Sequence, residues 1–325
     1  MRTTEAGRGR WPANRLGRWP RRTLVTAVLF VLPSLGHAAA CCGGGFSLPS
    51  LLTGDDRAQM TTSLASTMTA IDVQPSGKWL PRANPERAET LKLEGAALIS
   101  DSWQAGASVP LTRRARVGPD GDAQASGLGD IALSLGVEAL PEWDYSAWQP
   151  KGIAFLQLLA PTGRSRLESA SDLNLDVTGR GFFSIGPGIV LLKIRPPFDV
   201  QLLLEAHRSL PRDLDSPQAG GAVHLEPGNG ATASLAGGWS KGDLRFGLSV
   251  LAAYEDGVSV HGTSSAASSE ILLERSAIVS TSVAYLVAAD WAAAAAYSDQ
   301  ALLGSPTNTT LSRSLTLSLQ RRWQR

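Results

Sequence analysis

The sequence predicts an all-β protein, an antiparallel up-and-down transmembrane β-barrel of about 12 strands, within a range of roughly 10 to 14. Three observations predict it: an N-terminal export signal, long segments that alternate between apolar and polar residues, and no later apolar run near the ~20 residues of a spanning helix. Charged residues make up 18% of the chain, below the roughly 25% of an average soluble domain. The formal net charge is +1 and no basic stripe stands out, so no nucleic-acid partner is expected.

The N-terminus has the order of a secretory signal. Residues 1–22 carry seven arginines and a single acidic residue, and an uncharged apolar run follows over 23–35. The small residues Ala38-Ala39-Ala40 then suit a signal peptidase. We therefore expect residues 1–40 to be a signal peptide, cleaved near Ala38–Ala40 during export to the bacterial outer membrane. A single-helix anchor is disfavoured, because the run is short and contains Pro33.

Both cysteines of the chain, Cys41 and Cys42, stand together at the predicted mature start. Two fates are open for them: a vicinal disulfide, or a lipid attached to Cys41. Without a nearby histidine or a further cysteine they make a poor metal site, and no metal or cofactor is expected. Glycines follow directly, so we expect a flexible leader over 41–57 and the outer-membrane barrel over 58–325.

Period-two alternation marks strands with two unlike faces. In 130–139 and 242–255, large apolar residues occupy one face, and charged or small residues occupy the other. The pattern recurs at 91–97, 199–209 and 275–290. Nine polar-face residues are candidates to face the lumen of the barrel: Lys92, Glu94, Asp130, Glu138, Gln201, Glu205, His207, Arg245 and Glu255.

Strand length separates a membrane barrel from a soluble β-sandwich. The alternating segments run over about 10 to 14 residues, whereas a soluble strand typically has 5 or 6 and a tilted membrane strand needs about 9 to 11. Turn-rich stretches such as 118–122 and 227–230 separate the segments. Consecutive strands with short connections close most simply into a barrel without an open edge.

The C-terminal segment resembles the last strand of outer-membrane barrels, which the barrel-assembly machinery recognises. Leu315, Leu317, Leu319 and Trp323 share one face, but Arg321 interrupts that face and Trp323 is not the last residue. Other aromatic residues stand near the ends of expected strands, where a membrane–water interface favours them: Trp103, Trp143, Tyr145, Trp148, Trp239 and Trp291. Outer-membrane lipid and the assembly machinery are thus the expected partners.

Residues 90–325 resemble the outer-membrane family named for a meta-cleavage pathway of phenol degradation. The resemblance lies in three motifs, which are Gly127-Leu128-Gly129-Asp130, then Leu158-Leu159-Ala160-Pro161-Thr162-Gly163, and then Asp176-Val177-Thr178-Gly179-Arg180-Gly181 leading into 182–193. It implies a barrel of about 12 strands that passes small, apolar or aromatic molecules. It implies no catalytic residues. The glycines of the three motifs would serve tight turns and close backbone packing rather than chemistry.

The sequence favours a passive pore or transporter over an enzyme. It contains no phosphate-binding loop, zinc-protease helix or nucleophile-elbow motif. An outer-membrane lipid hydrolase could use His207 as base and Ser209 as nucleophile, but both residues lie on the expected lumen face, away from lipid. A structural or surface-interaction barrel without transport, and a secreted or lipid-anchored soluble β-protein, remain the alternatives. The transported solute is not specified.

Overall fold

The computed structural model describes residues 48–325, except for 119–120, 142–145, 147, 172, 218–219, 263–268 and 325. The predicted signal peptide, Cys41 and Cys42 therefore lie outside the described residues, as do Trp143 and Tyr145. Among the residues that are described, no helix has the length and apolar character needed to cross a membrane.

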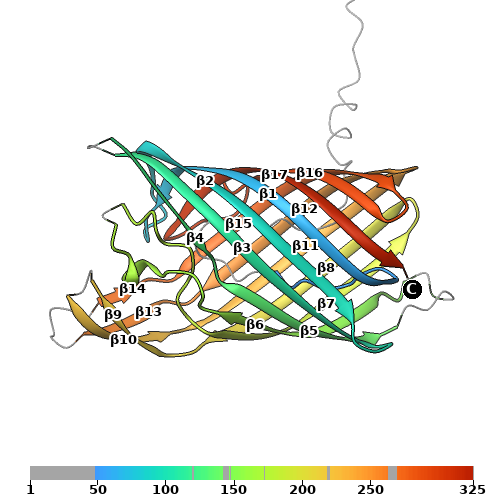
Figure 1. Ribbon diagram of the computed structural model, residues 1–325, viewed down its shortest axis with the longest axis horizontal. Helices are drawn as coiled ribbons and strands as arrows, with labels where there is room; N and C mark the ends of the chain where they lie inside the picture. The colour runs from blue at the N-terminus through green and yellow to red at the C-terminus, as the bar shows by residue number, and fades with distance from the viewer. Residues whose placement is uncertain are drawn as a thin grey trace, which may run out of the picture. The chain divides into compact units, whose positions relative to one another are not determined.

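A closed ring of antiparallel strands forms the body of the protein (Figure 1). Each strand pairs with its neighbours in the ring, and the first pairs with the last, with Leu64 opposite Leu317. The expectation of a barrel of about 12 strands is confirmed. The ring consists of β1 (Asp56–Val73), β2 (Trp79–Leu98), β3 (Trp103–Gly118), β5 (Ile131–Leu140), β6 (Lys151–Ala160), β7 (Ser184–Arg195), β8 (Phe198–Ser209), β11 (Asn229–Lys241), β12 (Leu244–Glu255), β15 (Glu274–Ala288), β16 (Trp291–Asp299) and β17 (Thr309–Gln324).

The wall is interrupted at one place. Strand β4 (Gly121–Leu128) runs on toward β5, but Gly129 and Asp130 between them are not in a strand. On one side β4 pairs with β3, while β6 ends at Ala160, opposite the start of β5. In the described sheet β4 therefore lacks a second strand partner. We call this place, Gly129–Asp130 with the free edge of β4, the wall break.

The outer face of the barrel is apolar and its inner face is polar. In β1, Thr61, Thr67 and the other inward residues are buried, whereas outward Leu64 and Met68 are 54% and 53% exposed. A soluble barrel would have the opposite arrangement, because its apolar residues would fill the interior. Large exposed apolar side chains on a closed ring fit a hydrocarbon surround, while buried serines, threonines and charges fit a hydrated lumen. The alternation predicted from the sequence thus has the expected direction.

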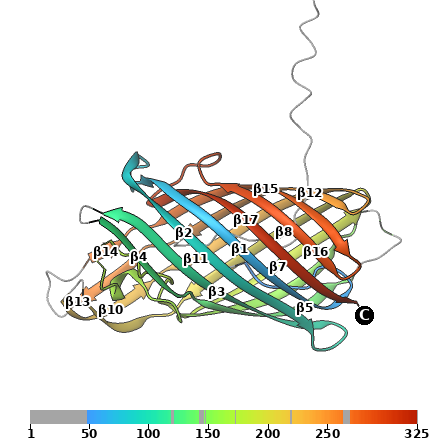
Figure 2. The same cartoon turned by 45° about the horizontal axis from the view of Figure 1, so that its top comes forward.

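The two ends of the barrel differ. Most connections at the end where the chain terminates are short turns, such as the one between β7 and β8; residues 141–150 between β5 and β6 are the longer exception. At the opposite end the connections are long and build a second sheet (Figures 1 and 2). This outer sheet, which the sequence did not predict, consists of β9 (Arg212–Ser216), β10 (Gly221–Pro227), β13 (Val258–Gly262) and β14 (Ser269–Ile271). Its apolar core includes Phe182, Val223, Leu225 and Val260.

Aromatic residues gather at the short-turn end. The rings of Trp239 and Phe246 stack at a centroid distance of 5.8 Å. The guanidinium of Arg321 lies over two indoles, 5.5 Å from Trp291 and 5.0 Å from Trp323. This contact explains how the terminal strand tolerates an arginine on its apolar face, because the charge sits at the rim among aromatic rings.

Candidate functional site: a constricted lumen

Residues 48–55, which directly precede β1, lie inside the barrel. The Ser50 hydroxyl donates to the carbonyl of Gly95 in β2 at 3.1 Å, and the Ser50 carbonyl accepts from the Ser134 hydroxyl in β5 at 2.8 Å. The amide of Gln59 donates to the carbonyl of Leu51 at 3.0 Å. Residues 48–55, which we call the lumen segment, were expected to belong to a flexible leader, so this part of the expectation is corrected. Hydrogen bonds to the wall and buried leucines hold them.

An apolar patch on the inner wall receives the lumen segment. Leu48 and Leu51 pack in one buried cluster with side chains of β6, β7 and β8, namely Ile153, Phe155, Val190 and Leu203. Inward-facing apolar side chains are unusual in a hydrated barrel, because burying them requires an apolar partner inside the lumen. The lumen is therefore polar on most sides and apolar on one.

A small cavity remains beside the lumen segment. Its volume is about 90 Å³, room for roughly three waters. The lining is mixed, since Leu51 and Leu203 face Glu94, Gln201 and Thr61. The lumen segment therefore occupies part of the lumen beside this cavity and narrows it at this level.

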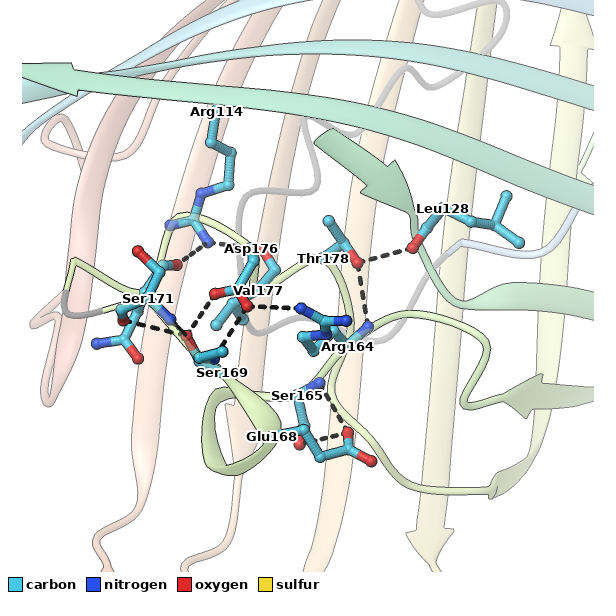
Figure 3. Close-up of polar contacts among 12 residues, drawn as sticks. Arg114, Leu128, Arg164, Ser165, Glu168, Ser169, Ser171, Asp176, Val177 and Thr178 are labelled. Atoms are coloured by element: carbon cyan, nitrogen blue, oxygen red, sulfur yellow. Dashed lines mark hydrogen bonds and ion pairs between the residues drawn. The ribbon is translucent and has the colours of Figure 1, made fainter. Parts of the chain in front are cut away.

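The 161–183 loop, which connects β6 to β7, supplies a second obstruction. The Thr178 hydroxyl donates to the Leu128 carbonyl at 2.7 Å (Figure 3). The Asp130 carboxylate accepts the backbone amides of Gly163 at 3.0 Å and Arg180 at 2.6 Å. The three glycine-containing motifs of the sequence thus meet at the wall break. At the wall break, where β4 has no second strand beside it in the described sheet, hydrogen bonds that involve the side chains of Thr178 and Asp130 join the loop to the wall.

Glycine is required where the loop approaches the wall break. A Cβ added at Gly179 would overlap the carboxylate of Asp130, and one at Gly163 would press on the backbone of Gly179. Alanine at either position would therefore push the loop away from Asp130. This agrees with the close-packing role that the sequence suggested for these glycines.

Ion pairs and hydrogen bonds hold the rest of the loop (Figure 3). Arg114 of β3 donates to the Val177 carbonyl at 2.7 Å, and Arg164 pairs with Asp176 at 2.8 Å. Burial alone would raise the pKa of Asp176, but hydrogen bonds from Ser169, Arg164 and the Ala170 amide outweigh it and lower the pKa to about 2. Asp176 is therefore ionised at any ordinary pH.

Arg180 carries the loop's charge into the lumen. Its guanidinium lies 2.6 Å from Glu255 of β12 and 3.4 Å from His207 of β8. His207 in turn lies 3.1 Å from Glu205 and 3.0 Å from Glu255. We call Arg180, Glu205, His207 and Glu255 the lumen charge cluster. Three of its members were candidates from the sequence. Arg180 was not among them, because a loop residue carries no period-two signal.

No protein-family model matches the chain, and no curated relative does. Among solved structures, the COG4313 outer membrane channel from Pseudomonas putida F1 matches with a TM-score of 0.64 and 14% identity, over 87% of this chain and 99% of that one. The chain has the fold of an outer-membrane channel. A TodX monoaromatic hydrocarbon channel mutant gives a TM-score of 0.46 at 12% identity, over 86% of this chain and 93% of that one. The KdgM porin in complex with disordered oligogalacturonate gives 0.40 at 6% identity, over 80% and 98%.

The remaining candidate residues are distributed along the barrel wall. Each of the charged ones has an ion-pair partner, and Gln201 lines the small cavity. Lys92 and Glu94 lie 2.8 Å apart, Glu138 lies 3.2 Å from Lys151, and Arg245 lies 2.6 Å from Asp199. All nine candidates are buried or half-buried in the channel. The structure brings Glu205, His207 and Glu255 together, with Asp130 linked to them through the backbone of Arg180.

The pairing of His207 with Ser209 as base and nucleophile is not favoured by the channel's geometry. Both ring nitrogens of His207 face carboxylates, and the Ser209 hydroxyl lies 2.7 Å from that of Ser184. A nucleophilic serine requires the base within hydrogen-bond reach of its own oxygen. The geometry instead makes His207 a member of an ion-pair network.

Proposed function

We propose that this protein is an outer-membrane channel for the passive passage of small molecules. The proposal rests on one observation: the barrel has an apolar outer face and a polar lumen. Two non-strand parts of the chain, the lumen segment and the 161–183 loop, obstruct that lumen, and none of the described wall strands does. Hydrogen bonds and side-chain contacts hold the lumen segment and the 161–183 loop. Such contacts can open and re-form without breaking the barrel ladder. The fold by itself does not specify transport.

Small apolar or aromatic molecules are the proposed solutes. The apolar patch around Ile153 and Phe155 offers such a molecule a surface inside an otherwise polar lumen. The resemblance to the barrel family of the meta-cleavage pathway supports the same class, and its three motifs form one contact unit at the wall break. Displacing Leu48 and Leu51 would uncover the patch.

The outer membrane is the proposed location. The barrel's short-turn end, where the first strand begins and the last strand ends, would face the periplasm, and its long-loop end would face outward. The export signal over 1–40, its cleavage near Ala38–Ala40, and recognition of β17 by the assembly machinery belong to the same proposal. Lipid would contact exposed residues such as Leu315 and Leu317, which are 55% and 54% exposed.

Single-channel conductance in a planar bilayer tests the proposal. A chain that begins at residue 48 retains the lumen segment, and a chain that begins at residue 56 lacks it, so the two form a matched pair. We expect the shorter chain to conduct several-fold more, because removing the segment clears the passage. Liposome swelling with small aromatic and polar solutes then reports selectivity. If both folded chains are electrically silent and impermeable, the barrel is structural and the channel proposal fails.

A further inference from the structure

The outer sheet carries a row of chemically distinct side chains. Asp213 of β9 lies directly opposite His224 of β10, and His224 lies directly opposite His261 of β13. Glu226 follows His224 by two positions, so it stands on the same face of the sheet. The neighbouring Leu214 and Leu225 point to the other face and are buried. Two imidazoles and two carboxylates therefore share one solvent-facing surface.

Asp213 and Glu226 lie near opposite nitrogens of the His224 ring. Asp213 lies 2.6 Å from Nδ1 of His224. On its far side, Nε2 of His224 lies 3.6 Å from one oxygen of Glu226, and Nε2 of His261 lies 3.7 Å from the other. A carboxylate beside Nδ1 accepts a hydrogen bond from the Nδ1–H group. This favours the tautomer whose free lone pair is on Nε2. Both Nε2 atoms thus face Glu226.

We propose that His224, His261 and Glu226 bind a divalent transition-metal ion, with zinc the best match, and that Asp213 is a positioning residue for His224. Imidazole nitrogen and carboxylate oxygen are ordinary zinc donors, and a histidine ligand commonly gives its other ring nitrogen to a carboxylate. With three protein donors, a fourth position would stay open to water or another ligand.

The ligands need only a small adjustment. As they stand, no three or more histidine, cysteine, aspartate or glutamate side chains among the described residues lie close enough together to hold a metal ion, so these ligands would have to move. Donors at about 2.1 Å from a tetrahedral ion lie about 3.4 Å from each other. The two nitrogen–oxygen distances here are 3.6 and 3.7 Å, one to each carboxylate oxygen of Glu226. The rings must also approach, because their centroids lie 6.5 Å apart. The side chains of His224, His261 and Glu226 are 43%, 55% and 59% exposed, so they are free to turn.

A bound ion would link two strands that are far apart in the chain. His224 lies on β10 and His261 on β13, and these strands cover Phe182, the last part of the 161–183 loop. The link would add to the cross-strand contacts that hold the outer sheet together, since an ion that binds only the folded sheet stabilises it. The inference concerns the outer sheet and does not depend on transport through the lumen.

Zinc titration by calorimetry tests the site. The chain from residue 41 onward is refolded without a histidine tag and with Cys41→Ser and Cys42→Ser, so that thiols do not contribute. We expect saturable binding of one Zn²⁺ per chain, reversal by a chelator, and no binding of Mg²⁺. Removing the outer-shell carboxylate by Asp213→Asn should weaken binding by roughly 10- to 100-fold, and His224→Ala or His261→Ala should weaken it more.

Asp215→Asn is the matched control, because Asp215 lies on the same exposed face of β9 and the substitution removes the same charge. It should leave zinc binding unchanged. Heat-dependent gel migration confirms that each variant is a folded barrel. The proposal is overturned if the parent chain shows no saturable zinc binding, or if the double variant His224→Ala/His261→Ala binds zinc as tightly as the parent. Equal weakening by Asp215→Asn would also overturn it, since a general charge effect would then explain the result.

Discussion

Between β17 and β2 the barrel wall is continuous, whereas between β4 and β6 it is interrupted. On the continuous side, β1 pairs with both neighbours along nearly its whole length. On the interrupted side, β4 has one strand neighbour, and the 161–183 loop contributes Thr178, Gly163 and Arg180 in place of another.

The continuous wall and the wall break depend on particular side chains to different degrees. The continuous wall is held by backbone hydrogen bonds, which any alternating sequence can make. At the wall break the backbone groups of Gly163 and Arg180 are satisfied by a single carboxylate, that of Asp130, which is 9% exposed. A change of side chain should therefore have large effects on one side and small effects on the other.

Replacing Arg180 with alanine should have the largest effect. Breaking a buried ion pair costs about 3–5 kcal/mol. Here the loss of Arg180 leaves Glu255 with His207 as its remaining partner, which offsets part of that cost. We expect the loop to leave the lumen, the single-channel conductance to rise, and the reversal potential to shift toward cation selectivity. Arg166→Ala, which removes an exposed arginine of the same loop, is the control. An unchanged conductance and selectivity for Arg180→Ala would show that the lumen charge cluster does not hold the loop.

Replacing Asp130 with alanine should have the next largest effect. Two backbone amides lose their acceptor, at about 1–3 kcal/mol each, partly offset because a carboxylate is no longer buried. We expect faster proteolytic cleavage within 161–183 and a lower melting temperature. Asp122→Ala, at an exposed position of β4, removes the same charge and should change neither. If the two variants behave alike, Asp130 does not anchor the loop.

Acid should loosen the loop over a defined range. The folded pKa of Asp176, about 2, lies below the value of about 3.9 expected in an unfolded chain. The stability that its ionised form contributes is therefore fully present above about pH 4 and is lost as the pH falls toward 2. The melting temperature should fall in this range more steeply for the parent than for Asp176→Asn. Parallel curves for the two proteins would contradict this role.

The smallest effect is expected on the continuous wall. Thr316 of β17 is 2% exposed, and its hydroxyl has no hydrogen-bond partner among the described residues. Valine has the same shape, so Thr316→Val should change the melting temperature little if the interior is dry at this point. A loss of about 1 kcal/mol or more would instead indicate that water in the lumen hydrates the hydroxyl. Either outcome reports how wet the continuous side is.

The sequence predicted the parts of the fold that repeat with period two. The faces of 130–139 and 242–255 point as expected, because alternation is a local property of the chain. The lumen segment was missed, since it makes its contacts without periodicity. One signal could have indicated its place: the segment 152–160 is apolar at almost every position, so an inward apolar patch around Ile153 and Phe155 needed a partner.

The candidate site was predicted only in part for a related reason. Glu205, His207 and Glu255 follow from strand alternation, whereas their partner Arg180 comes from a loop whose position depends on distant contacts. The outer sheet was missed as well, because its strands are short, such as Arg212–Ser216, and stand among turn residues. Pairing between distant short strands leaves little trace in a single sequence.

The seam between β1 and β17 has a consequence for how the protein is made. The side-chain amide of Gln320 donates a hydrogen bond to that of Gln59, 261 positions away in the chain. The ring can therefore close only when the last strand is available to pair with the first. Until then both strands have free edges that would pair with any neighbouring chain, and such distant contacts form slowly. A truncation that removed β17 alone would therefore leave an aggregation-prone open sheet with two unpaired edges.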